Sequence, residues 1–140
     1  MDMNVNVIFL RFFLAALCGV IIGLEREVRD KSAGLRTHIL VCIGACLFGM
    51  LGLTLAADYR NADILRLAQG VLIGVGFLGA GVIMREGASI KGLTTAAGIW
   101  VMGAIGLAIG VGSYYIALVG TLFSFLTVAL FGRVERLVKK

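Results

Sequence analysis

Hydrophobic residues run along this chain in long stretches that short polar segments interrupt. About 20 consecutive apolar residues are needed to cross a hydrocarbon core roughly 30 Å thick. The final apolar stretch, 93–131, has no charged residue and is too long for one crossing, so we take GVGS near its middle as a tight turn. The pattern predicts five membrane-spanning helices, at about residues 5–24, 37–57, 64–84, 93–109 and 114–131.

The composition indicates that most of the chain lies in the lipid bilayer. Hydrophobic residues make up 60% of the 140 residues and charged residues 15%, and the chain has 20 glycines and no proline. A soluble domain is about 45–50% apolar and about 25% charged. Abundant glycine suits membrane helices whose backbones approach one another closely. The expected fold class is therefore an all-α membrane protein, in which residues 1–140 form one domain of five closely packed transmembrane helices.

The basic residues favour one orientation in the membrane. With five spans, segments 25–36 and 85–92 and the tail after 131 share one side and carry ten basic residues, whereas the polar segments of the other side have only Arg60 and Arg66. Positive charge marks the cytoplasmic side, so we expect the N-terminus outside and the C-terminus in the cytoplasm. The net charge of +5 does not indicate nucleic-acid binding, because no extended basic face with interleaved aromatic residues is present.

The stretch GVGFLGAGVIM, residues 74–84, begins with the G-x-G-x-x-G spacing of dinucleotide-binding loops. No predicted strand precedes it and no acidic residue follows about 20 positions later, so a packing helix is favoured over a nucleotide loop. At about 100° per residue, Gly70, Gly74 and Gly81 share one face of this helix, and Gly76 and Gly79 lie roughly opposite. We expect these glycines to pack against helices on both sides, with the third span in a central position.

Two further patterns predict close helix packing. The G-x-x-x-G spacing occurs at Gly19 and Gly23 in the first span and at Gly106 and Gly110 in the fourth. In the second span, bulky aliphatic residues lie opposite a stripe of small or polar residues that should face protein. This stripe consists of His38, Cys42, Ala45, Gly49 and Gly52.

Polar side chains within or beside the spans are costly in lipid and are candidate functional groups. Glu25 directly follows the first apolar run, and the segments GLEREVRDKSAGLRTH and REGASIKGLTT lie on the same side, so they can meet. The candidate polar or ligand-binding residues are Glu25, Arg26, Arg36, Thr37, His38, Thr94 and Thr95, together with Arg66 and Gln69 near the start of the third span. The alternative is an ordinary solvated loop with weak surface ion pairs.

Catalysis and metal binding have little support in the sequence. The chain has one histidine and no convincing nucleophile–base set, so we expect it not to be an enzyme and to need no cofactor. Magnesium prefers carboxylate oxygens, and no carboxylate lies inside a predicted span, which argues against a conventional divalent-cation pore. Arg66 has a candidate partner in Asp63, three residues earlier.

Three segments carry a resemblance to a known family. GLEREVRDKSAGLRTHILVCIGACLF, GVGFLGAGVIMREGASIKGLTTAAGIW and AIGLAIGVG, which fall between about residues 16 and 112, strongly resemble the MgtC/SapB membrane proteins. Arg66 matches an arginine that this family carries before its glycine helix. The resemblance implies a multi-pass protein of the bacterial inner membrane, linked to magnesium limitation and, in pathogens, to virulence. Larger members add a cytoplasmic ACT-like domain after the last span, and this chain resembles the short members without it.

The residues and the resemblance leave two hypotheses for the function. The first is a regulatory protein linked to magnesium homeostasis that acts through helix–helix contacts in the bilayer. It would form a homodimer or another homo-oligomer, or bind other membrane proteins such as the F-type ATP synthase, which some members of the family bind. The alternative is a small ion or solute transporter or channel, perhaps for Mg²⁺, with Glu25 and the threonines at its cytoplasmic mouth.

Overall fold

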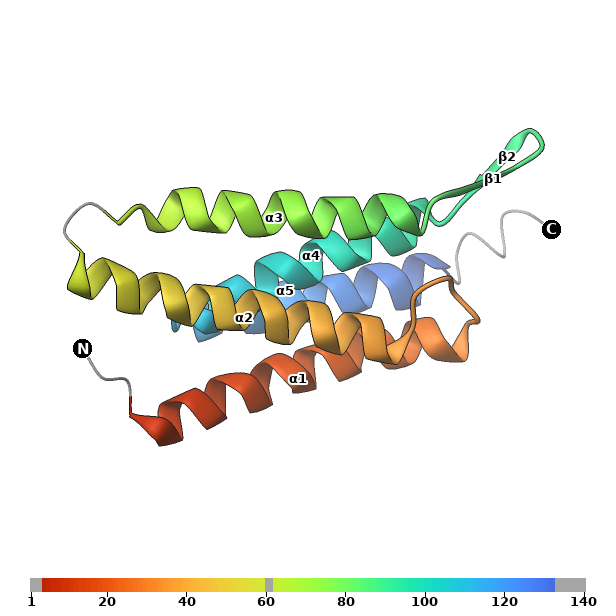
Figure 1. The fold of residues 1–140 in the computed structure, drawn as a ribbon. Coiled ribbons are helices and arrows are strands. Elements are labelled where there is room, and N and C mark those ends of the chain that lie inside the picture. Colours follow the sequence, from red (N-terminus) through yellow and green to blue (C-terminus); the bar gives the residue numbers. More distant parts are fainter. Residues whose placement is uncertain (1–3, 60–61, 133–140) are drawn as a thin grey trace.

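The computed structural model describes residues 4–59 and 62–132 of the chain. Five long helices run side by side along a common direction (Figure 1). They are α1 (Val5–Val28), α2 (Leu35–Asp58), α3 (Ile64–Gly81), α4 (Leu93–Gly110) and α5 (Tyr114–Leu126), which continues into the π-helix η1 (Thr127–Phe131). With η1 included, all five are long and apolar enough to cross a membrane. The prediction of an all-helical membrane protein with five spans is confirmed.

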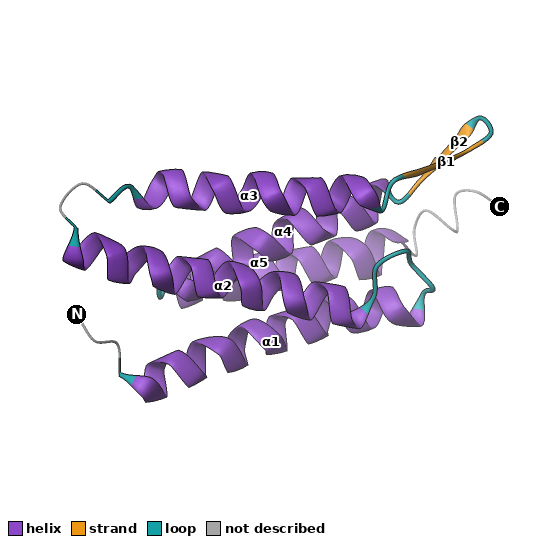
Figure 2. Cartoon of the chain, viewed as in Figure 1, coloured by secondary structure: helices purple, strands orange, loops and turns teal. Residues whose placement is uncertain are grey.

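The third span ends earlier than predicted. After α3 the chain enters a small antiparallel hairpin, β1 (Met84–Glu86) and β2 (Ser89–Lys91), in which Met84 pairs with Lys91. The hairpin projects beyond the helices at one end of the bundle (Figure 2). Gly87, in the turn between the two strands, and Gly92, directly after β2, have positive φ angles of 61° and 91°, a conformation that favours glycine. The predicted span included residues 82–84 because they are apolar, but in the structure they are not helical.

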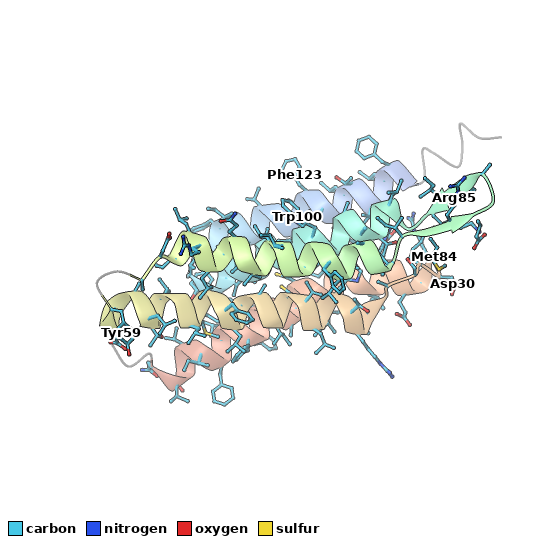
Figure 3. All side chains as sticks on the ribbon, turned by 45° about the horizontal axis from the view of Figure 1, so that its top comes forward. Asp30, Tyr59, Met84, Arg85, Trp100 and Phe123 are labelled. Atoms are coloured by element: carbon cyan, nitrogen blue, oxygen red, sulfur yellow. The ribbon has the colours of Figure 1, made fainter. Side chains whose placement is uncertain are left out.

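The two ends of the bundle collect different loops. Asp30, Met84 and Arg85 lie at one end, and Tyr59 lies at the opposite end (Figure 3). We call the first the hairpin end and the second the Tyr59 end. Between them, Trp100 and Phe123 stand out from the bundle surface, with 47% and 65% of their area exposed, as expected of side chains that face lipid.

The core lies along α2 and α4, which share the most extensive contact of any two elements. The predicted stripe of α2 is buried throughout, from His38 to Gly52. On α4 the fully buried side chains include Ile99, Met102 and Ile109. The expectation that small and polar residues of the second span face protein is therefore confirmed.

Both predicted G-x-x-x-G pairs lie at helix crossings. A Cβ added to Gly19 of α1 would lie 2.6 Å from the Cα of Ile39, and a Cβ at Gly23 would lie 2.8 Å from the Cα of Leu35. On α4, a Cβ at Gly106 would overlap the carbonyl oxygen of Cys42 on α2. Since real Cβ atoms do not approach backbone this closely, α1 and α4 can reach α2 only through glycine.

The prediction that the third span is central is wrong for the single chain. Within α3 only Val75 and Gly79 are buried. Val75 fills the space left by Gly103 of α4, and a Cβ at Gly79 would lie 3.3 Å from the carbonyl oxygen of Ala96. The physical reason is that α1 and α4 already occupy two sides of α2, so α3 packs at the edge of the bundle. Nothing lies within 4 Å of a Cβ at the other predicted packing glycines, Gly70, Gly74, Gly76 and Gly81.

A substitution at Gly106 tests the α2–α4 crossing. Gly106→Ala should lower the free energy of unfolding by about 1–3 kcal/mol, because the new methyl group overpacks against the backbone of Cys42. Gly44→Ala is the matched control, since a Cβ at Gly44 of α2 meets nothing within 4 Å. Unfolding by SDS in mixed micelles measures both variants. Equal stabilities would contradict the crossing described here.

Candidate functional site

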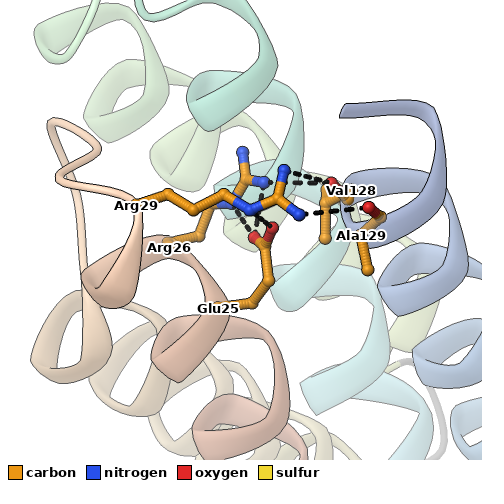
Figure 4. Close-up of polar contacts among 5 residues, drawn as sticks. All are labelled: Glu25, Arg26, Arg29, Val128 and Ala129. Atoms are coloured by element: carbon orange, nitrogen blue, oxygen red, sulfur yellow. Dashed lines mark hydrogen bonds and ion pairs between the residues drawn. The ribbon is translucent and has the colours of Figure 1, made fainter. Parts of the chain in front are cut away.

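A compact ionic cluster ties the hairpin end of α1 to the end of α5. Glu25 lies in the last turns of α1, and its two carboxylate oxygens are each in an ion pair (Figure 4). Arg26 pairs with Oε2 of Glu25, and Nε of Arg29 lies 2.6 Å from Oε1. We call these three side chains the Glu25 cluster. Both oxygens of this carboxylate are thus engaged by guanidinium groups that are always charged.

The π-helix η1 supplies the other partners of the two arginines. Nη1 of Arg29 donates to the carbonyl of Val128 at 3.3 Å, and Nη2 donates to the carbonyl of Ala129 at 3.1 Å (Figure 4). Arg26, only 3% exposed, also points Nη2 at the Val128 carbonyl, at 3.5 Å. A buried cation is tolerated when it is paired and hydrogen-bonded. The cluster therefore joins residues about a hundred positions apart and holds α1 against η1.

The sequence predicted part of this cluster. It placed Glu25 and Arg26 together but omitted Arg29, although the spacing of four residues from Glu25 is the spacing of a helical ion pair. The Val128 and Ala129 carbonyls carry no sequence signal. Arg36 and Thr94, which were expected around Glu25, are exposed at the surface.

His38 is fully buried between α1, α2 and α4. Its Nδ1 lies 2.8 Å from the carbonyl oxygen of Gly34, so this nitrogen donates a hydrogen bond. Its Nε2 faces Gly98 of α4, where a Cβ would lie 3.6 Å away, and has no hydrogen-bond partner within residues 4–59 and 62–132. Thr95 is also buried, at 3% exposure, one turn before Gly98. Of the residues expected around Glu25, His38 and Thr95 thus lie inside the bundle, and Thr37 is half-buried.

At the Tyr59 end, Arg11 caps a helix. Its Nη1 donates to the carbonyl of Gly110 at 2.7 Å, and its Nε donates to the hydroxyl of Tyr114 at 3.2 Å. Gly110 is the last residue of α4, where unpaired carbonyls make the helix terminus electronegative. No sequence pattern marks Arg11 for this role, because its partners lie about a hundred residues away.

Arg66 and Gln69 lie on the exposed side of α3. The expected pairing of Arg66 with Asp63 is wrong, because the Asp63 carboxylate instead caps α3 and accepts from the backbone nitrogens of Leu65 and Arg66 at 2.9 and 3.1 Å. Neither the Arg66 nor the Gln69 side chain has a hydrogen bond or ion pair to the described part of the chain. These two polar groups are therefore available to the surroundings of the bundle.

An apolar groove of about 510 Å³ lies between α2 and α3. Its α3 wall includes Leu67, Gly70, Gly74 and Leu78, and its α2 wall runs from Leu40 through Gly44 to Phe48. We call it the α2–α3 groove. A second cavity of about 410 Å³ lies toward the hairpin end and includes Thr37, Phe77, Gly81 and Ile99 in its lining. Within the described ranges, no three His, Cys, Asp or Glu side chains are grouped as metal ligands.

The Glu25 cluster predicts a strong and specific effect on stability. Glu25→Gln should lower the free energy of unfolding by about 3–5 kcal/mol, because it leaves the buried Arg26 guanidinium without its counter-charge. Arg36→Ala is the control, since Arg36 is an exposed arginine at the same end of the bundle, and its effect should stay within about 0.5 kcal/mol. Unfolding in mixed micelles measures both. A Glu25→Gln variant as stable as Arg36→Ala would show that the cluster does not hold α1 to η1.

Comparison with known proteins identifies the family. The model of the MgtC family matches residues 12–137. YhiD of Escherichia coli (strain K12), named as a candidate magnesium transporter, is 42% identical over 137 residues, covering 94% of this chain and 64% of its own length. SrpB of Synechococcus elongatus is 41% identical, covering 94% of this chain and 84% of its own length. MgtC of Salmonella typhimurium (strain LT2) is 43% identical over 113 residues, covering 81% of this chain and 47% of its own length.

The chain thus spans less than two thirds of YhiD and about half of the Salmonella protein. No solved structure matches it. The family model covers most of the chain, including the Glu25 cluster, the glycine-mediated crossings and α3. The protein belongs to the MgtC family.

Proposed function

We propose that this protein is a regulatory component of magnesium homeostasis in the bacterial inner membrane, acting through helix–helix contacts with a second copy of itself and with other membrane proteins. The observation that carries the proposal is Gln69, an uncovered amide within a spanning helix. It lies five residues after the start of α3, about 8 Å along the helix axis. An amide that faces hydrocarbon without a hydrogen-bond partner is unfavourable, and a partner helix can supply one.

The surface around Gln69 suits a helix. Gly76 and Ala80 lie seven and eleven residues after Gln69, each within about 20° of it on opposite sides, so the three residues share a strip of α3 about 40° wide. A Cβ at Gly76 meets nothing within 4 Å, and Ala80 is exposed. Small residues on a membrane helix let a neighbouring backbone approach closely. We call Gln69, Gly76 and Ala80 the Gln69 strip, and we propose it as the contact surface.

The link to magnesium rests on the relatives. YhiD is named as a candidate magnesium transporter, and the proposal assigns this chain to the same physiological process. A regulatory role is favoured over transport because both oxygens of the Glu25 carboxylate are held by Arg26 and Arg29. A hydrated divalent cation would have to displace a guanidinium group to bind there. The F-type ATP synthase is a proposed partner, to be sought by co-purification.

Self-association in bilayers tests the Gln69 strip. Donor- and acceptor-labelled copies in proteoliposomes should show energy transfer that rises with protein density. Gln69→Leu should weaken the association by about 1 kcal/mol, the order of one hydrogen bond in a membrane, and Gly76→Leu should abolish it by blocking close approach. Gly74→Leu is the matched control, because it adds the same bulk to the other open face of α3. Equal effects of the two glycine variants would refute the assignment of the strip.

Magnesium transport is the competing function, favoured by the name of YhiD. Proteoliposomes loaded with a magnesium-sensitive dye distinguish the two functions. We expect no flux of Mg²⁺ above that of empty vesicles, because the Glu25 carboxylate is already neutralised. A flux of Mg²⁺ above that of empty vesicles, retained in the Arg36→Ala variant, would replace the regulatory proposal by transport.

A further inference from the structure

The α2–α3 groove points to a ligand that the proposed function does not involve. We infer that it binds one acyl chain of an anionic phospholipid, whose phosphate pairs with Arg66 at the end of the groove. The groove and the Gln69 strip are different surfaces of α3. Gly70 and Gly74 line the groove, whereas Gln69 and Gly76 lie on another side of the helix. An experiment can therefore contradict one of the two proposals without contradicting the other.

The groove is elongated along α3. Its α3 wall extends from Leu67 to Leu78, eleven steps along the helix of 1.5 Å each, or about 16 Å. An extended hydrocarbon chain can lie along this length.

The length and lining of the groove also match an acyl chain. One leaflet of the hydrocarbon core is about 15 Å thick, close to the length of the α3 wall. Gly44, Gly70 and Gly74 each leave open space where a side chain would otherwise fill the groove, and Leu40, Phe48 and Leu78 complete an apolar surface. A methylene chain in this groove gains contact on both walls, which is the source of attraction between apolar groups in lipid.

Arg66 gives the site its charge preference. It precedes Gly70 by four residues, so it lies one turn closer to the Tyr59 end on the same side of α3. Its side chain is exposed and forms no ion pair with residues 4–59 or 62–132, and the Asp63 carboxylate is engaged in capping α3. A guanidinium group binds phosphate oxygens through two parallel hydrogen bonds. With the chain in the groove, a headgroup phosphate would lie at the level of Arg66.

The bound lipid would have a structural role. Because α3 buries only Val75 and Gly79 against the rest of the bundle, a chain held between α2 and α3 would fill much of the remaining interface. The position of α3 would then depend on the phospholipid composition of the membrane. This dependence is a property of the groove and requires no partner protein.

Photolabelling tests the inference on the complete chain. The protein is reconstituted in phosphatidylcholine vesicles with a trace of phosphatidylglycerol that carries a photoreactive group in mid-chain. Labels should concentrate at residues 40–48 and 67–78, and unlabelled phosphatidylglycerol should compete better than phosphatidylcholine. Arg66→Gln should reduce this preference about fivefold, the effect of one basic residue at a membrane surface. Gly74→Leu should remove most of the labelling in the groove by filling it.

Gly76→Leu is the control and should leave the labelling unchanged. If Gly74→Leu fails to fold, as judged by circular dichroism, Gly44→Leu fills the groove from its α2 wall. Labels spread evenly over the exposed faces of all the helices would mean bulk lipid only and would overturn the inference. Loss of self-association in Gly74→Leu but not in Gly76→Leu would mean that side chains of a second copy occupy the groove, and would overturn it too.

Discussion

Close backbone contact around α2 is the constraint on which the rest of the structure depends. Glycines of α1 and of α4 bring two helix backbones against α2 at distances that no side chain allows. In lipid, where apolar side chains gain little by leaving the solvent, such contact supplies dispersion energy that separated helices lack. Because α1 and α4 occupy two sides of α2, α3 packs at the edge of the bundle. The uncovered surfaces of α3, to which we assign contact and lipid binding, follow from this arrangement.

Two sets of polar groups differ in where they find their partners. Glu25, Arg26 and Arg29 form ion pairs with one another, the two arginines donate to two carbonyls of η1, and Arg11 caps the last turn of α4. These groups are paired inside the chain and stabilise its fold. Arg66 and Gln69 lie on the outside of α3 and find no partner in the described part of the chain. Because a polar group in a span is costly without a partner, the second set indicates where the protein meets its surroundings.

A regulatory role and a bound lipid are compatible in one small bundle. The firmly packed part, α1, α2 and α4, has its backbones in contact and its buried charges paired. The lightly held part, α3, has an open strip on one side and an apolar groove on another. A helix held by few internal contacts is the element whose position other membrane components can influence most. That division places the proposed contacts of the protein on α3.

The sequence by itself determined the membrane class, the five spans, the buried stripe of α2 and the two glycine pairs at crossings. These depend on local hydropathy and on helical periodicity, which neighbouring residues reveal. The sequence could show that the glycines of α3 permit another helix to approach closely. It could not show whether such a helix lies beside them. Only the tertiary structure decided that α3 lies at the edge, that Arg29 and η1 complete the Glu25 cluster, and that Arg11 caps α4. Those pairings join residues about a hundred positions apart, and their partners are often backbone carbonyls, which every residue has and no sequence pattern marks.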